Sequence, residues 1–220
     1  IELKNDSDIN LVSWYRPAQA SKPTILFLHG NAGNISNRAF KAKIFIEEGY
    51  GFLLVGYRGY GNNKGNPSEK GLYNDALTSF NFLQDQGISS NNIILYGESL
   101  GAAIAVDLAF KMAKKRPIRS LILESPFSSM VDAAQNHYPY IPVKFLLKDR
   151  YDSYSKISNI NTPLFIFHGG KDKTVPINLG KKLFNRALNP KFAHWEDNAG
   201  HNDLFEFSVE EKIMDFIEKH

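Results

Sequence analysis

A serine, an aspartate and a histidine follow one another along the chain in three short polar loops, as Ser99, Asp172 and His201. A serine hydroxyl is a weak nucleophile near neutral pH. It needs a histidine base in hydrogen-bond reach, and that histidine needs a carboxylate to hold its tautomer. These residue types therefore indicate acyl transfer, in which the serine attacks an acyl carbon. Whether they meet depends on the elements that carry them.

Ser99 is the centre of the pentapeptide 97–101, Gly-Glu-Ser-Leu-Gly. The apolar run 93–96 precedes it, and an alanine-rich helical pattern follows it. A strand, a sharp turn and a helix form the setting of the G-x-S-x-G nucleophile elbow, where strained backbone points the serine out of the sheet. The setting predicts that Ser99 is the nucleophile rather than an ordinary helix cap.

Asp172 and His201 also follow apolar runs, at 164–167 and 192–195. Loops at the carboxyl ends of parallel strands meet at one edge of the sheet, where ligands bind in open α/β folds. We therefore expect Asp172 to orient His201, and His201 to serve as the base. Other candidates stay open at this point: Asp197 and Asp203 for the carboxylate, and His29, His137, His168 and His194 for the base.

The positioning elements follow from hydrophobic periodicity. Strands are expected at 9–16, 24–28, 52–55, 93–96, 120–124, 164–167 and 192–195. Helices are expected at 36–48, from 67–69 to about 83, from 102 to the basic run 114–116, at 177–187 and at 204–217. Continuous apolar strands that alternate with helices indicate a mostly parallel, twisted sheet with helices on both faces.

One stretch interrupts this alternation. Residues 127–160 have no strand pattern and are rich in aromatic residues and proline. A connection of this length is typical of a lid or small subdomain, and the prolines favour short helices and turns. We expect one α/β domain over 1–220 with a small cap insertion at approximately 127–160.

Composition excludes several kinds of protein. The net charge of +3 does not require a nucleic-acid partner. The chain has no cysteine, which excludes disulfides and thiolate metal sites. Its histidines are dispersed, so no metal site is expected. No apolar run is long enough to span a bilayer. We expect membrane association only through a segment preceding Ile1, and the sequence fixes neither localisation nor oligomeric state.

Five motifs occur together in a fixed order. They are His-Gly-Asn-Ala-Gly-Asn at 29–34, Tyr-Arg-Gly-Tyr-Gly at 57–61, the elbow at 97–101, Gly-Lys-Asp at 170–172 and Gly-His at 200–201. With these motifs the chain resembles the serine hydrolases of the α/β-hydrolase superfamily. It is most similar to the abhydrolase-domain proteins that share the first three, and the resemblance covers nearly the whole chain.

The resemblance implies an α/β-hydrolase fold and a role for each matching residue. Ser99 would be the nucleophile, His201 the general base and acid, and Asp172 the residue that orients His201. The backbone N–H groups of Asn31 and Leu100 would form the oxyanion hole. The implied reaction is cofactor-independent hydrolysis of a carboxylic ester or thioester through an acyl-enzyme intermediate.

Four further residues are candidate substrate contacts: Tyr57, Arg58, Phe127 and Tyr138. Arg58 and Tyr57 follow a strand beside the expected site, where they would contact a carboxylate or phosphate unless Arg58 forms a structural ion pair. The aromatic cap favours a small-molecule or lipid-like acyl ester as substrate. Two alternatives remain: a serine peptidase of the same fold, and a non-catalytic binding protein that retains it.

Overall fold

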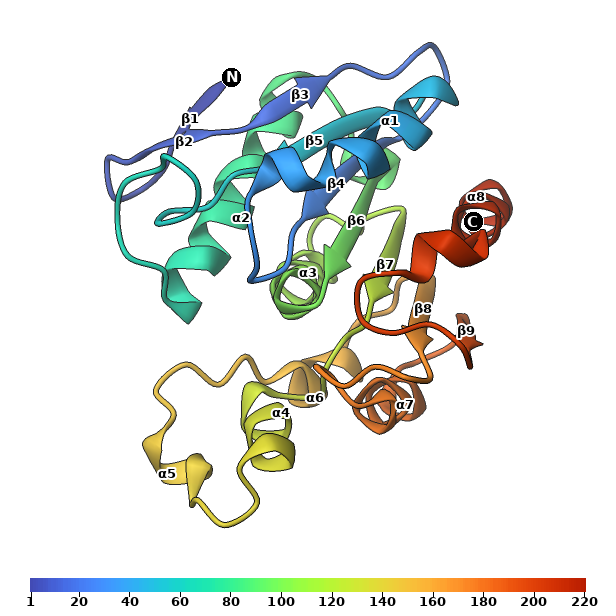
Figure 1. The fold of residues 1–220 in the computed structure, drawn as a ribbon. Coiled ribbons are helices and arrows are strands. Elements are labelled where there is room, and N and C mark those ends of the chain that lie inside the picture. The colour runs from blue at the N-terminus through green and yellow to red at the C-terminus, as the bar shows by residue number, and fades with distance from the viewer.

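The computed structural model describes residues 1–220, and its centre is a seven-stranded sheet (Figure 1). The strands lie in the order β3–β5–β4–β6–β7–β8–β9. Their bounds are β3 Trp14–Arg16, β4 Thr24–Leu28, β5 Gly51–Val55, β6 Ile93–Glu98, β7 Ser120–Glu124, β8 Leu164–Gly169 and β9 Lys191–Glu196. All neighbours pair in parallel except β3, which runs antiparallel to β5 at one edge. The predicted mostly parallel sheet is confirmed.

Two layers of helices cover the sheet, because successive residues of a strand face opposite sides. The helices are α1 Ala39–Glu47, α2 Glu69–Asp85, α3 Leu100–Met112, α7 Ile177–Arg186 and α8 Val209–Lys219. In β4, Ile25 and Phe27 belong to the apolar cluster that includes residues of α1 and α8. Leu26 and Leu28 belong to the cluster on the other face, with residues of α2, α3 and α7. The core is therefore double-sided, as the continuous apolar strands predicted.

The connection between β7 and β8 contains three short helices and no strand. They are α4 Met130–His137, α5 Val143–Leu146 and α6 Ser153–Ile157. Figure 1 places α4 and α5 beyond the carboxyl ends of the parallel strands, at the end of the molecule opposite the N-terminus. In contrast, α6 packs against α3 and α7. This segment therefore stands over the sheet edge at which the site was expected.

The strand predicted at 9–16 is interrupted. Asn10–Val12 forms β2, which pairs with β1 (Glu2–Lys4) in a separate two-stranded sheet, and β3 resumes at Trp14. The break falls at Ser13, whose Oγ accepts a hydrogen bond from the Gly56 N–H at 3.0 Å. The polar contact ties this bend to the end of β5.

Two predicted helices begin with a separate 3-10 turn. Ile35–Arg38 precedes α1, and Leu204–Phe207 precedes α8. The second turn ends at Ser208, whose φ of 53° lies in the left-handed region. A helix cannot continue through that conformation, so the single helix predicted at 204–217 is broken. A third 3-10 turn, Ser90–Asn92, leads into β6.

Asp75 connects α2 to the loop after β5. Its carboxylate is fully buried and accepts from the Arg58 backbone N–H at 2.9 Å and from the Arg58 Nη2 at 2.7 Å. The Asn5 Nδ2 donates to the same carboxylate at 2.8 Å. Burial of a charge is tolerated here because both carboxylate oxygens have charged or polar partners.

Replacement of Asp75 by alanine should lower the free energy of unfolding by about 3–5 kcal/mol, because it leaves the Arg58 guanidinium without its buried partner and with only the more distant, exposed Asp6 as a counter-charge. Asp85→Ala, at an exposed position of the same helix, should change it by less than about 0.5 kcal/mol. Urea unfolding of both variants measures the difference. Equal, small effects would mean that solvent already compensates Arg58.

Candidate active site

Ser99 stands at a tight turn between β6 and α3. Its backbone has φ 53° and ψ −112°, a left-handed conformation that a residue with a side chain adopts only under strain. The Ser99 N–H donates to the Glu124 carbonyl at 2.9 Å, which joins the turn to β7. The sequence favours this turn because Gly97 and Gly101 stand two residues away on either side of Ser99.

The two glycines of the elbow allow backbones to touch. A Cβ on Gly101 would lie 1.9 Å from the Leu28 carbonyl oxygen. A Cβ on Gly97 would lie 2.5 Å from the Ala102 Cα. Any side chain at either position would push α3 away from the sheet. The pentapeptide spacing is thus a packing requirement of the strand–helix crossing.

His201 links the serine to a carboxylate. Its Nε2 lies 3.1 Å from the Ser99 Oγ, and its Nδ1 lies 2.6 Å from the Asp172 Oδ2. A carboxylate only accepts, so Nδ1 carries the proton and Nε2 presents its lone pair to the serine hydroxyl. Asp172 follows β8 and His201 follows β9, and the parallel sheet brings both loops to the elbow. The arrangement can remove a proton from Ser99.

Asp172 is held in its ionised form. Burial would raise the pKa of its carboxyl, but hydrogen bonds from His168 and His201 and from the Val175 N–H outweigh burial and hold it well below its usual range. The Oδ1 accepts from the N–H groups of Thr174 at 2.8 Å and Val175 at 2.7 Å. These bonds fix the carboxylate so that Oδ2 faces His201.

The other candidates for the carboxylate and the base have different contacts. Asp203 accepts the Gly200 N–H at 2.6 Å and so orders the loop beside His201. The four other candidate histidines pair with main-chain carbonyls or with carboxylates. The carbonyl partners are Gly30 for His29, Thr174 for His137 and Val175 for His168. The carboxylate partners are Asp172 for His168 and Glu196 for His194. Neither these histidines nor the other two carboxylates contact Ser99.

A cavity of about 410 Å³ opens over Ser99. It is lined mainly by apolar side chains from α2, α4, the turn before α4, the segment between α5 and α6, and the loops after β5 and β8: Tyr60, Pro67, Leu72, Phe127, Met130, Ala133, Ala134, Tyr151 and Val175. Asn31, Ser99 and Leu100 line the same cavity. The Asn31 N–H has no acceptor in the chain, and Leu100 begins α3, where a helix N–H lacks an intrahelical acceptor. Two free donors therefore border the serine.

The four predicted substrate contacts are placed differently. Phe127 lines the cavity. Tyr57 is fully buried in the core, and Arg58 is buried against Asp75, so neither side chain can reach a ligand over Ser99. Arg58 therefore forms the structural ion pair that was the alternative to a ligand contact. Tyr138 directly follows α4, is largely exposed and does not line the cavity.

Behind the elbow lies a charge cluster that the sequence analysis did not identify. Glu98 pairs with the Lys41 Nζ at 2.8 Å and with Arg38, and Lys41 also bridges to Glu124 at 2.7 Å. The Gly30 N–H, in the loop that carries Asn31, points at the Glu98 Oε1 at 3.3 Å. Burial would raise the pKa of Glu98, but Lys41 and Arg38 lower it to about 2. The cluster ties the elbow to α1 and the loop after β4.

One signal could have indicated this cluster. Glu98 and Glu124 end strands that are otherwise apolar and buried, so each needs a buried cation. Lys41 is the buried basic residue of α1 that supplies it.

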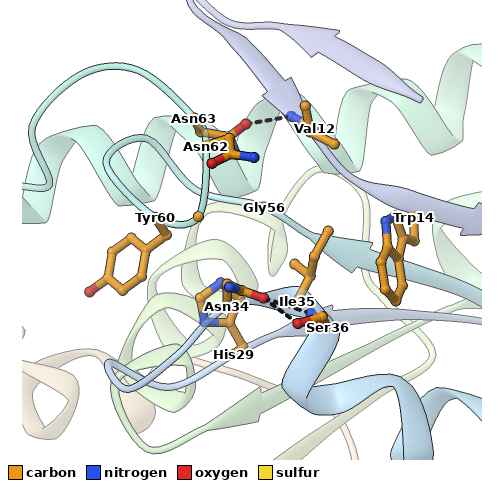
Figure 2. A pocket seen from close by; sticks show the side chains of 11 residues that line it. Val12, Trp14, His29, Asn34, Ile35, Ser36, Gly56, Tyr60, Asn62 and Asn63 are labelled. Carbon is orange, nitrogen blue, oxygen red and sulfur yellow. Dashed lines mark hydrogen bonds between the residues drawn. The ribbon is translucent and has the colours of Figure 1, made fainter.

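A second cavity, of about 340 Å³, lies between the loops after β4 and β5 (Figure 2). Tyr60 lines both cavities. Ser99 lines only the first, and Asp172 and His201 line neither. Asn34 and Asn63 use their carbonyl oxygens internally, on Ser36 and on the Val12 N–H (Figure 2). No charged side chain lines it. This cavity is separate from the one over Ser99.

Comparisons with known proteins place the chain. The family model described as serine aminopeptidase, S33, matches residues 19–149. The chain belongs to this family, within the α/β-hydrolase superfamily. It is 38% identical over 206 residues to an uncharacterised protein of Mycobacterium tuberculosis (strain H37Rv), covering 92% of this chain and 72% of that one. The expected superfamily and fold are confirmed.

Two further relatives add detail. Lysophosphatidylserine lipase ABHD12 of Rattus norvegicus is 37% identical over 191 residues, covering 79% of this chain. The match covers 48% of the lipase, so this chain corresponds to about half of its length. The crystal structure of an α/β hydrolase from Vibrio vulnificus superposes with a TM-score of 0.82 at 26% identity, over 98% of this chain and 79% of that one.

The chain contains no group of three or more histidine, cysteine or acidic side chains placed to hold a metal ion. None of its helices combines the length and apolar character needed to cross a bilayer.

Glu98 should make the fold more sensitive to acid. Its folded-state pKa of about 2 lies below the ordinary 4.5, so its stabilising contribution is complete above about pH 4.5 and is lost as pH falls toward 2. Over that interval the wild type should lose about 3 kcal/mol more unfolding free energy than Glu98→Gln. Urea unfolding at a series of pH values tests this, with exposed Glu47→Gln as the control. The prediction would be contradicted if the unfolding free energy of Glu98→Gln fell with decreasing pH as steeply as that of the wild type.

Proposed function

We propose that the protein is a serine esterase that hydrolyses lipid-like acyl esters or thioesters through an acyl-enzyme intermediate. One observation carries the proposal: the hydrogen-bonded line from Ser99 through His201 to Asp172, at the wall of an apolar cavity. An ordinary helix cap would not need a base 3.1 Å from its hydroxyl. Three side chains and two backbone N–H groups supply every group the reaction requires, so no cofactor is proposed.

The proposed reaction has two halves. The Ser99 Oγ attacks the acyl carbon while the His201 Nε2 takes its proton, and the N–H groups of Asn31 and Leu100 bind the oxyanion. His201 then gives that proton to the departing alcohol or thiol. A water molecule repeats the sequence on the acyl-enzyme, which releases the acid and restores Ser99. Asp172 stays ionised and stabilises the imidazolium that forms in each half.

The proposed substrate class rests on the cavity and on the relatives. An apolar cavity of about 410 Å³ suits an acyl chain better than a charged ligand. The ABHD12 relatives are named lysophosphatidylserine lipases, although the chain covers only about half of their length. We propose that residues 1–220 act as one domain and that the insertion at about 127–160 caps this cavity.

A peptidase is the second candidate, because the matching family is described as serine aminopeptidase, S33. Asp149 lines the cavity and forms no ion pair in the chain, so it could bind the amino group of a peptide substrate. Hydrolysis of aminoacyl p-nitroanilides with greater kcat/KM than p-nitrophenyl esters would replace the esterase proposal.

Ser99→Ala and His201→Ala should each lower kcat for p-nitrophenyl butyrate by about 10⁴-fold or more, and Asp172→Asn by about 10³-fold or more. His194→Ala and Ser155→Ala, which lie outside the line of hydrogen bonds, should retain wild-type rates. A fluorophosphonate should label the wild type and not Ser99→Ala. Unlabelled wild-type protein without activity would instead indicate a binding protein that retains the fold.

Ala134→Leu should shorten the preferred acyl chain, because Ala134 lines the cavity and the added methyl groups would project from α4. We expect kcat/KM for p-nitrophenyl octanoate to fall about tenfold, with p-nitrophenyl acetate little changed. Ala113→Leu, which lies outside the cavity on the far end of α3, is the matched control. A uniform loss across all chain lengths would place the acyl group elsewhere.

A further inference from the structure

The cap carries an unusual concentration of exposed apolar side chains. Tyr140 is 98% exposed and Phe145 is 84% exposed, and other exposed apolar residues lie on the same short segment: Tyr138, Ile141 and Leu146. Val143 is the buried member of α5, and it anchors the turn to the protein. One buried residue holds this turn in place while its aromatic rings lie in solvent. Exposed apolar patches of this kind mark interaction sites.

Basic side chains accompany the apolar ones. Lys144 and Lys148 are exposed, and neither forms an ion pair with a carboxylate of the chain. Arg150 also has no carboxylate in ion-pair distance of its guanidinium, which instead donates to the Lys144 carbonyl at 2.8 Å. Asp149 is the one acidic residue of the segment, and it faces the cavity over Ser99. The outer surface of residues 138–150 is therefore apolar and positive.

This surface is continuous with the mouth of the cavity. His137, which precedes the segment, lines the cavity over Ser99, and so does Asp149 near its end. The intervening residues 138–148 form a loop that begins and ends at the cavity wall and projects away from the sheet (Figure 1). Whatever binds the loop is held beside the opening.

We infer that residues 138–148 dock the protein onto an anionic lipid bilayer, with Tyr140 and Phe145 inserted among the headgroups and Lys144 and Lys148 on the lipid phosphates. Aromatic rings favour the bilayer interface, and basic residues beside them are attracted to anionic lipids. A second protein is a poorer occupant, because one short projecting turn cannot supply the roughly 800 Å² per partner of a standard interface. Docking would face the cavity toward the membrane, so that an acyl ester enters it without crossing water. The entry of an acyl ester from the membrane rests on the proposed function, whereas docking itself does not.

The test measures binding without turnover. In a Ser99→Ala background, vesicles of equal parts phosphatidylcholine and phosphatidylglycerol are floated with the protein, beside vesicles of phosphatidylcholine alone. The parent protein should bind the anionic vesicles, and added salt should release it. Tyr140→Ser/Phe145→Ser and Lys144→Glu/Lys148→Glu should each weaken binding by about tenfold or more. Matched controls on α3 and its end, Phe110→Ser and Lys114→Glu/Lys115→Glu, should bind as the parent does.

A second measurement separates docking from catalysis. With Ser99 present, both cap variants should hydrolyse soluble p-nitrophenyl butyrate at the wild-type rate. Vesicle binding by a protein that hydrolyses no ester would support docking and reject the proposed function. The inference is overturned if the parent protein does not bind anionic vesicles, if the controls lose as much binding as the cap variants, or if light scattering shows that the cap residues instead join two copies of the chain.

Discussion

The close crossing of α3 over the sheet is the constraint on which the rest of the structure depends. At Gly97 and Gly101 the backbones of strand and helix meet without side chains between them. The turn that makes this crossing possible forces Ser99 into left-handed backbone and points its hydroxyl outward. The same turn sets the direction of Glu98, which faces the α1 side of the sheet together with Tyr96. One packing contact thus orients both the Ser99 hydroxyl and a buried carboxylate.

Two buried networks of opposite charges support the loops around this turn. Arg38 and Lys41 balance Glu98 and Glu124 beneath the elbow, and Arg58 balances Asp75 beneath the loop after β5. In each, ionised groups are stable in the interior because every charge has a counter-charge and hydrogen bonds. Electrostatic contacts at α1 therefore hold the loop after β4, and the contact with Asp75 of α2 holds the loop after β5. As a result, the backbone that borders the cavity over Ser99 is fixed.

The sequence predicted those features of the site that follow from the order of strands and loops. It did not predict the contacts between side chains that are far apart in the chain. Periodicity predicted the sheet, and the loops at its carboxyl edge predicted which serine, histidine and aspartate the fold would bring together. Tyr57 and Arg58 were misplaced as ligand contacts because a loop sequence does not tell which side chains turn inward. The Lys41 to Glu124 contact joins residues 83 positions apart, and no local pattern specifies such a pair. The break at Ser208 arises from a single left-handed residue, and the break at Ser13 falls where its side chain contacts Gly56; hydrophobic periodicity reports neither.

His201 reaches Ser99 across 102 residues, from the loop after the last strand of the sheet. β9 is an edge strand with one neighbour, β8, and its residues are partly exposed. Edge elements open more readily than central strands, while β6 and α3 remain in the core. A nascent chain would thus hold Ser99 in its turn without its proposed base until β9 had joined the sheet. In the folded protein, local fraying of β9 would separate the proposed base from Ser99 well before global unfolding.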